Sequence, residues 1–354
     1  MKPPYARRFL VLLLSPIIFS LFSCPMPIEE MARMSSREMI ESLTRGVRNA
    51  RITVGIVQNG EMSFAVYGEN GRVRPNREYL YDIGSISKAI TGHLFARAIY
   101  ENLLTLECLD NSIDLFLDLP PKDYYPTIRH LLTHTSGYQF GYAYFLPPKS
   151  TPFENPWYGV TREMLMHHVR TINLENRNYQ WNYSNFGLSV AGLVLESIFN
   201  EDYASLIRRY FQDLGLNSIR AGDGRSNLSF HYRWNRGNPY IASGGLVSTV
   251  TDLMKFAQMQ MNQTLTYAEH AQRVWAEVNT TFDFPELGNR TDAMGLGWFI
   301  DRDNNITWHG GANSTFCTYV GFDTAEGIAV VVLSNIRSGI PTWVIGSRKF
   351  EELR

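Results

Sequence analysis

Residues 81–92, Tyr81-Asp82-Ile83-Gly84-Ser85-Ile86-Ser87-Lys88-Ala89-Ile90-Thr91-Gly92, form the stretch from which the rest of the chain is best interpreted. An extended run ends at Gly84 and apolar residues then recur at helical spacing, so the pattern predicts a helix that opens at Ser85. Ser85 and Lys88 are three residues apart, which places a hydroxyl and an amine on one face of that helix. The stretch therefore predicts a junction of extended chain and helix that carries two reactive groups.

The chemistry of a serine and a lysine at this spacing depends on the protonation of the amine. A serine hydroxyl is a poor nucleophile until a base takes its proton, and a lysine can act as that base if burial or another cation lowers its pKa. The start of a helix adds partial positive charge where an oxyanion would form. Ser-x-x-Lys also fits an ordinary solvated helix start, so the remainder of the sequence must decide between the two interpretations.

The composition is that of a well-packed globular protein. Of 354 residues, 44% are hydrophobic and 13% aromatic, which is enough for the core of two average domains or one large one. The formal net charge is -1 and the basic residues are dispersed, so we expect no nucleic acid partner. The three cysteines, Cys24, Cys108 and Cys317, are too few and too far apart for a disulfide framework or a zinc site. We expect Cys108 and Cys317 to be small buried hydrophobic residues.

The N-terminal segment has the pattern of an export signal. Basic residues precede an apolar run over residues 9–22, which is shorter than the roughly 20 residues needed to span a bilayer. The run ends in Leu21-Phe22-Ser23-Cys24, which resembles a bacterial lipobox and implies a signal peptide over 1–23, lipidation of Cys24 and a tether over 24–34. Plain secretion and an uncleaved anchor are the alternatives. Each places the body outside the cytoplasm, in the periplasm or at the cell surface, and lipidation would attach it to the membrane.

Both ends of the remaining chain carry strand signals. Ser35 and Glu38 form a capping-box pattern for a first helix, and two β-rich runs joined by Asn59-Gly60 predict a hairpin. After Ser85 the pattern becomes helical and rich in loops, and strand signals return from Gly295. The expected strands are 52–57, 62–67, 297–301, 306–308, 316–322 and 328–333, and a last helix is expected over 343–353.

This order of segments predicts one α+β unit over residues 35–354. The expected antiparallel sheet is built from residues 35–84 and 241–354 and is flanked by terminal helices, with a mostly helical lobe, residues 85–240, inserted between them. Ser85 falls at the border of the two parts, so the nucleophile should lie at the seam between the lobes.

Four short motifs, in this order, resemble those of the serine β-lactamase-related hydrolases. The likeness is to the branch with class C β-lactamases, D-alanyl-D-alanine carboxypeptidases, D-aminopeptidases and some carboxylesterases, and it implies a β-lactamase/transpeptidase-like fold. Supporting stretches at 242–249, 295–298 and 321–323 also match in type. The motifs are Ser85-Ile86-Ser87-Lys88, Leu131-Leu132-Thr133-His134-Thr135-Ser136-Gly137, Tyr183-Ser184-Asn185 and His309-Gly310-Gly311.

The resemblance implies a serine hydrolase that works through an acyl-enzyme. Ser85 would attack a carbonyl carbon while Lys88 and Tyr183 take its proton and pass it to the leaving group. Asn185 would hold Lys88 and the substrate amide by hydrogen bonds. No metal and no organic cofactor is required, and the partner is a small-molecule or peptide substrate.

The resemblance also assigns the substrate-binding strand. The oxyanion would lie between the backbone N–H groups of Ser85 and Ala312, the residue after His309-Gly310-Gly311. Glycine at Gly310 and Gly311 would let the substrate backbone approach closely. His134 is a candidate general base, but its family counterpart is better understood as holding a turn near the cleft.

One departure from the family pattern bears on the substrate. The middle position of the motif at His309-Gly310-Gly311 is often a threonine in the family, whose hydroxyl helps to bind a substrate carboxylate, and here it is Gly310. Loss of a charge-assisted hydrogen bond typically costs roughly 1.5 to 3 kcal/mol, so we expect an esterase or D-Ala-type peptidase rather than an efficient β-lactamase. The pocket walls are expected from residues 138–160 and 225–240.

A second class of function is a catalytically inactive binding module of the cell envelope with the same fold. A site that has lost its activity usually lacks at least one reactive residue, whereas Ser85, Lys88 and Tyr183 are all present. The sequence therefore favours the enzyme over the binding module.

Overall fold

The computed structural model describes residues 26–139, 155–175, 177–228, 230–262, 264–278, 287–288 and 290–354. The expected signal peptide and Cys24 lie outside these residues, and so does most of the expected pocket wall at 138–160. Within the described ranges, every helix is too short or too polar to cross a membrane.

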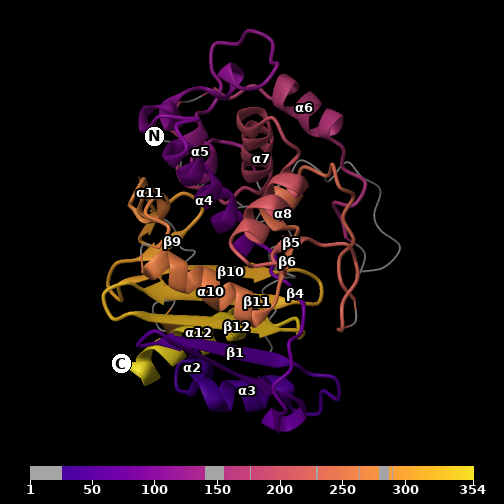
Figure 1. Cartoon of the computed structure of the whole chain (residues 1–354), viewed down its shortest axis with the longest axis vertical. Helices are drawn as coiled ribbons and strands as arrows, with labels where there is room; N and C mark the ends of the chain where they lie inside the picture. Colours follow the sequence, from indigo (N-terminus) through magenta and orange to yellow (C-terminus); the bar gives the residue numbers. More distant parts are fainter. Residues whose placement is uncertain are drawn as a thin grey trace, which may run out of the picture.

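The largest element of the described chain is a sheet in which every pair of neighbouring strands is antiparallel (Figure 1). Its first strands come from the N-terminal part and the others from the C-terminal part, and the two sets join where β1 pairs with β12. In spatial order the strands are β3 (Val73–Arg74), β2 (Glu61–Tyr67), β1 (Ile52–Gln58), β12 (Ile328–Ser334), β11 (Cys317–Asp323), β10 (Ile306–Ala312), β9 (Phe299–Asp301), β8 (Ala293–Met294) and β7 (Ala276–Glu277).

Local signals account for the N-terminal part of this sheet. Asn59 and Gly60 both have positive φ, 53° and 80°, which is the geometry of a tight hairpin turn, and they join β1 to β2 with Gln58 opposite Glu61. Ser35 caps α3 (Ser36–Thr44) in a full capping box with Glu38. The expected hairpin and first helix are confirmed.

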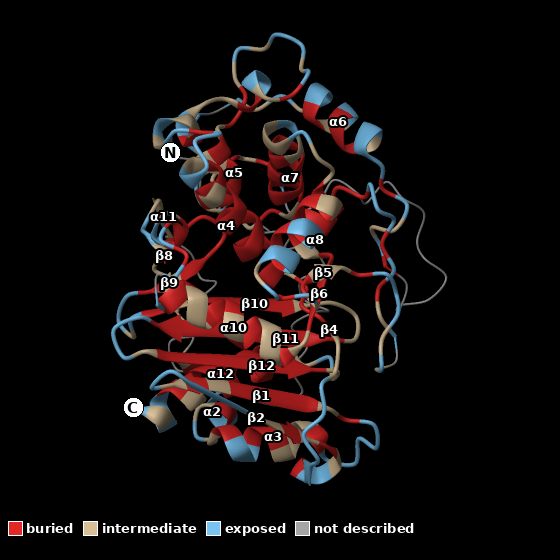
Figure 2. Ribbon diagram, in the orientation of Figure 1, coloured by how far each residue is buried: buried red, intermediate tan, exposed pale blue. Residues whose placement is uncertain are grey.

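Each face of the sheet packs against helices. In β12, Ala329, Val331 and Leu333 point into the core shared with the helical lobe, and the residues between them point into the core under α3 and α12. A strand with both faces buried must be apolar throughout, and Figure 2 shows the buried colour along β1 and β10 to β12. The first face carries α10 (Val250–Met261), and the second carries α3 and α12 (Ile340–Leu353).

The helical lobe surrounds α4 (Ile86–Tyr100), whose residues 86–96 are all buried. α4 packs against α7 (Asn185–Phe199), α9 (Ile241–Gly244) and α11 (Ala268–Gln272). The other helices of the described chain are α2 (Ile28–Met31), α5 (Ile128–Leu132), α6 (Arg162–Thr171) and α8 (Tyr203–Asp213), with the 3-10 turns η1 (Glu69–Gly71), η2 (Leu106–Asp110) and η3 (Ile113–Leu115).

A small second sheet links the two lobes. Its strands, in the order β4 (Tyr81–Asp82), β6 (Leu246–Ser248) and β5 (Arg220–Ala221), are two or three residues long, which is too short for a period-2 pattern to reveal them in the sequence. β4 ends three residues before Ser85, and α4 begins directly after Ser85, so this sheet fixes the position of the chain that carries the nucleophile.

The two described cysteines differ in burial. Cys317 is buried on β11, as expected, but Cys108 is only partly buried in η2, so the prediction for Cys108 is wrong. In this 3-10 turn Leu109 is the residue that turns into the core, and Cys108 beside it stays partly exposed. Both thiols are free.

The contact between α4 and the segment before β9 gives a test of the fold. A Cβ added to Gly92 would lie 1.8 Å from the Leu296 carbonyl oxygen, a backbone atom that cannot turn away. Alanine in a helix interior is normally favoured over glycine by about 1 kcal/mol, but overpacking typically costs about 1–3 kcal/mol. We therefore expect Gly92→Ala to lower the free energy of unfolding, measured by urea denaturation.

Gly244→Ala is the matched control, because Gly244 is also helical and a Cβ there would meet nothing within 4 Å. We expect its stability to stay within about 0.5 kcal/mol of the wild type. Equal stability of the two variants would contradict the packing described here.

Candidate active site

Ser85 lies at the junction of β4 and α4, where the chain turns sharply. Gly84 has a φ of +52°, a left-handed conformation that favours glycine. The turn is held by Ser87, whose hydroxyl donates to the Gly84 carbonyl at 2.7 Å and accepts from the Leu246 N–H at 3.1 Å. Ser85 makes no capping hydrogen bond with its own helix and is the one half-buried residue in an otherwise buried run from 81 to 90, so its hydroxyl is presented at the seam.

Lys88 is completely buried beside Ser85. Its Nζ lies 2.9 Å from Ser85 Oγ and donates a hydrogen bond to the Ser243 carbonyl. Within the described residues no carboxylate pairs with it, and burial lowers the pKa of the Lys88 amine well below its ordinary value. A neutral amine has two N–H groups and one lone pair. Since the Ser243 carbonyl can only accept, the lone pair is available to the hydroxyl of Ser85.

Tyr183 completes the group from the loop before α7. The Lys88 Nζ lies 4.8 Å from the centroid of its ring. Burial raises the pKa of the Tyr183 hydroxyl above its usual value, and a hydrogen bond with Ser85 opposes this shift without cancelling it. The structure therefore brings Ser85, Lys88 and Tyr183 together, with the pKa of the phenol raised and the pKa of the amine lowered.

His134 fixes the loop that carries Tyr183. Its carbonyl accepts from the Asn182 N–H at 2.8 Å, and its Nδ1 accepts from the Ser184 N–H at 3.1 Å. Its ring centroid lies 4.5 Å from that of Tyr183. Burial, Lys88 and His309 all hold the pKa of His134 well below its usual value. The prediction that His134 holds a turn near the cleft is confirmed by these contacts.

The end of β10 lies against the turn before the nucleophile. A Cβ on Gly84 would lie 2.9 Å from the Ala312 nitrogen, and a Cβ on Gly311 would lie 2.0 Å from the Ile83 carbonyl oxygen. Only glycines allow these two backbones to approach so closely. The backbone N–H groups of Ser85 and Ala312 thus belong to segments in direct contact.

His309 and Gly310 lie on opposite faces of β10. The His309 ring stacks on Phe299 with centroids 4.5 Å apart, and its Nδ1 donates to the Gly310 carbonyl at 2.6 Å. Burial and the neighbouring Lys88 lower the pKa of His309 to about 3, so the ring is neutral at physiological pH. A Cβ on Gly310 would lie 2.3 Å from Trp343 Nε1, so this glycine makes room for α12.

Asn185 lies at the first turn of α7, and its contacts differ from the expected hydrogen bond to Lys88. Among the described residues its side chain makes no hydrogen bond to Lys88, and the Ser243 carbonyl is the second partner of that amine. Ser243 belongs to the supporting stretch 242–249, but a backbone carbonyl leaves no signature in residue type. A buried amine needs a hydrogen-bond acceptor, and this requirement alone could have predicted that some carbonyl lies beside Lys88.

The part of the chain that the structure describes contains no group of three or more His, Cys, Asp or Glu side chains able to hold a metal ion. The reactive groups described at the site are the hydroxyl of Ser85, the amine of Lys88, the imidazoles of His134 and His309 and the phenol of Tyr183.

Comparisons with known proteins bear on the family and the fold. The Beta-lactamase family model matches residues 39–348. A β-lactamase/D-alanine carboxypeptidase from Yersinia pestis has a TM-score of 0.70 at 17% identity, over 92% of this chain and 99% of its own. An octameric penicillin-binding protein homologue from Pyrococcus abyssi has a TM-score of 0.68 at 22% identity, over 89% and 75% of the two chains.

Among curated proteins, Protein flp of Staphylococcus aureus (strain MRSA252) is 21% identical over 306 residues. The match covers 80% of this chain and 59% of that protein, so the chain spans about three fifths of the length of this relative. The fold is the expected α+β, β-lactamase/transpeptidase-like one. Since the family model spans most of the sequence, the chain belongs to the Beta-lactamase family of serine β-lactamase-related hydrolases.

Proposed function

We propose that the protein is a serine hydrolase that cleaves an uncharged ester or amide through an acyl-enzyme on Ser85. One observation carries this proposal: the buried amine of Lys88, with its lowered pKa, lies 2.9 Å from the hydroxyl of Ser85. A neutral lysine at this distance is a base positioned to activate a nucleophile.

The proposed reaction begins when Ser85 Oγ attacks the carbonyl carbon of the substrate and its proton moves to Lys88. The negative charge that develops on the carbonyl oxygen is stabilised by the N–H groups of Ser85 and Ala312. Tyr183, which is protonated, donates its proton to the leaving group as the carbonyl re-forms and takes up the proton held by Lys88, so that both residues return to their starting states. A water molecule then attacks the acyl-enzyme along the same proton route, releasing the acid and restoring Ser85. Asn185 is proposed to contact the substrate amide.

The preference for an uncharged substrate rests on β10. His309 is neutral at physiological pH, and Gly310 offers no hydroxyl and backs onto Trp343. A substrate carboxylate would find no charge-assisted hydrogen bond from these two positions. The proposal therefore favours simple esters and peptide-like amides over β-lactams. We further propose export, with Cys24 as a lipid attachment point, from the sequence pattern of residues 1–24.

The first prediction for this function is a substrate preference. Purified protein should hydrolyse an aryl ester such as p-nitrophenyl butyrate with a higher kcat/KM than a chromogenic cephalosporin, because the cephalosporin carries a carboxylate. Ser85→Ala, measured in parallel by absorbance, should lose at least about a thousandfold in kcat. Faster hydrolysis of the cephalosporin would contradict the substrate class, and an active Ser85→Ala variant would contradict the nucleophile.

The pH dependence of the ester reaction gives a second prediction. Lys88 must be deprotonated to act as a base, and its pKa lies well below the usual value near 10.5. The value of kcat/KM should therefore rise as the pH rises through this lowered pKa and should already be high near neutrality. Since the pKa of Tyr183 is raised, the rate should not fall again below about pH 10. A rise centred near 10.5 would contradict the lowered pKa of Lys88, on which the proposal depends.

A further inference from the structure

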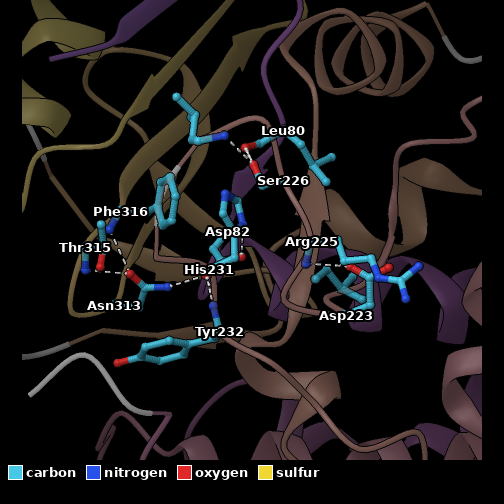
Figure 3. Close-up of polar contacts among 12 residues, drawn as sticks. Leu80, Asp82, Asp223, Arg225, Ser226, His231, Tyr232, Asn313, Thr315 and Phe316 are labelled. Atoms are coloured by element: carbon cyan, nitrogen blue, oxygen red, sulfur yellow. Dashed lines mark hydrogen bonds and ion pairs between the residues drawn. The ribbon is translucent and has the colours of Figure 1, made fainter. Parts of the chain in front are cut away.

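Asp82 is a buried carboxylate only three residues before Ser85. It is 4% exposed and lies on β4. A carboxylate inside a protein is costly unless several donors satisfy its oxygens. Asp82 Oδ1 lies 2.8 Å from His231 Nδ1, and its Oδ2 accepts from the Tyr232 N–H at 2.9 Å and from Asn313 Nδ2 at 2.8 Å (Figure 3).

The three donors come from two segments that are far from β4 in the sequence. His231 and Tyr232 belong to the loop between β5 and α9, and Asn313 is the first residue after β10. These segments also bind each other, because the Tyr232 hydroxyl hydrogen-bonds Ser314 Oγ at 2.5 Å and accepts from the Ser314 N–H at 3.2 Å. The His231 side chain, 1% exposed, packs on Phe316 with ring centroids 4.4 Å apart. Both segments therefore bind to Asp82 on β4, the strand that precedes Ser85.

Asn313 uses both ends of its side chain. Its Nδ2 donates to Asp82, and its Oδ1 accepts from the N–H groups of Thr315 and Phe316 at 2.9 and 2.7 Å. Its own N–H donates to the Phe316 carbonyl at 2.9 Å. The amide thus fixes the turn that follows Ala312 and ties that turn to β4 (Figure 3).

The hydrogen bond between Asp82 and Asn313 lies next to the place where the segments carrying the Ser85 and Ala312 N–H groups contact each other. Ala312 immediately precedes Asn313, and its nitrogen lies where a Cβ of Gly84 would approach to 2.9 Å. A second tie, from Thr318 Oγ1 to the Ile83 carbonyl at 3.0 Å, lies on β11. The spacing of the two segments therefore depends on few polar contacts, and Asp82 provides one of them.

We propose that Asp82 is a positioning residue that sets the place of the Ala312 N–H, relative to the Ser85 N–H, through its hydrogen bond with Asn313. This inference rests on the proposed acyl-transfer function. Asp82 does not touch the reacting atoms. It aligns a donor that is most important when the oxyanion forms, so its loss should affect the transition state more than substrate binding.

The test is the ester kinetics of Asp82→Asn, which keeps the shape of the side chain but places an NH₂ group among three donors. We expect kcat to fall about 10- to 100-fold with KM within about twofold, since a misplaced donor loses part of its effect. Asn313→Ala should show the same split. The double variant should be no slower than the slower single variant, because both changes remove the Asp82–Asn313 contact through which the alignment acts.

Asp323→Asn is the matched control. Asp323 is also buried, and its Oδ1 accepts from the N–H groups of Ala325 and Glu326 and from Asn305 Nδ2, but it lies at the opposite end of β11 from Asn313. We expect it to lower the thermal unfolding temperature and to keep the kcat of the wild type. This control separates loss of alignment from general destabilisation.

A folded Asp82→Asn protein with kcat within twofold of the wild type, or above it, would overturn the inference. Equal loss of kcat in Asp323→Asn would also overturn it, and so would independent, multiplicative losses in the double variant. If Asp82→Asn does not fold, an unchanged kcat in Asn313→Ala overturns the inference by itself. A wild type without ester turnover would overturn the proposed function and this inference together, whereas a normal Asp82→Asn in an active protein refutes only the inference.

Discussion

The site depends on an amine that is buried with no counter-ion among the residues that the structure describes. Lys88 is fully enclosed, and its polar contacts among the described residues are with Ser85 and the Ser243 carbonyl. Charging it there would require an ammonium ion to lose its hydration without a carboxylate among the described residues in return, so burial lowers the pKa of the amine and favours the neutral form. The packing around α4 produces this burial, since the backbone at Gly297 passes so near that a Cβ would lie 2.3 Å from the Lys88 carbonyl oxygen.

Three buried bases with lowered pKa values lie close together in the site. His134 and His309 are buried near Lys88, and the pKa of each is lowered by burial and by that amine. A proton on any of the three would raise the cost of a second one. Lys88, His134 and His309 can therefore together accept the single proton that moves during acyl transfer. A site whose bases are uncharged offers no cation to a substrate carboxylate, which agrees with the departure from the family pattern at Gly310.

Local sequence signals predicted much of this structure, including the Asn59-Gly60 hairpin, the Ser35 capping box and the helix that opens at Ser85. The strands β5 and β6 were missed because two or three residues carry no measurable alternation, whereas β4 lies in the extended run that was expected to end at Gly84. The contact of Asp82 with His231 joins residues 149 apart in the sequence, so no spacing rule could predict it. Ser243 acts through its backbone, which any residue type supplies. A buried carboxylate needs hydrogen-bond donors, but the sequence does not show which residues supply them to Asp82.

The measurement that tests the neutral lysine most directly is the free energy of unfolding of the wild type and Lys88→Met from pH 6 to 10. Between the lowered pKa and about 10.5, the unfolded chain binds a proton at Lys88 that the folded chain lacks, so wild-type stability rises with pH. Methionine, of similar volume, removes this slope. We predict that Lys88→Met is more stable than the wild type near pH 7, and that this advantage shrinks toward pH 10 by at most about 1.4 kcal/mol for each pH unit. A variant that is less stable than the wild type at pH 7, with an unchanged slope, would contradict the account.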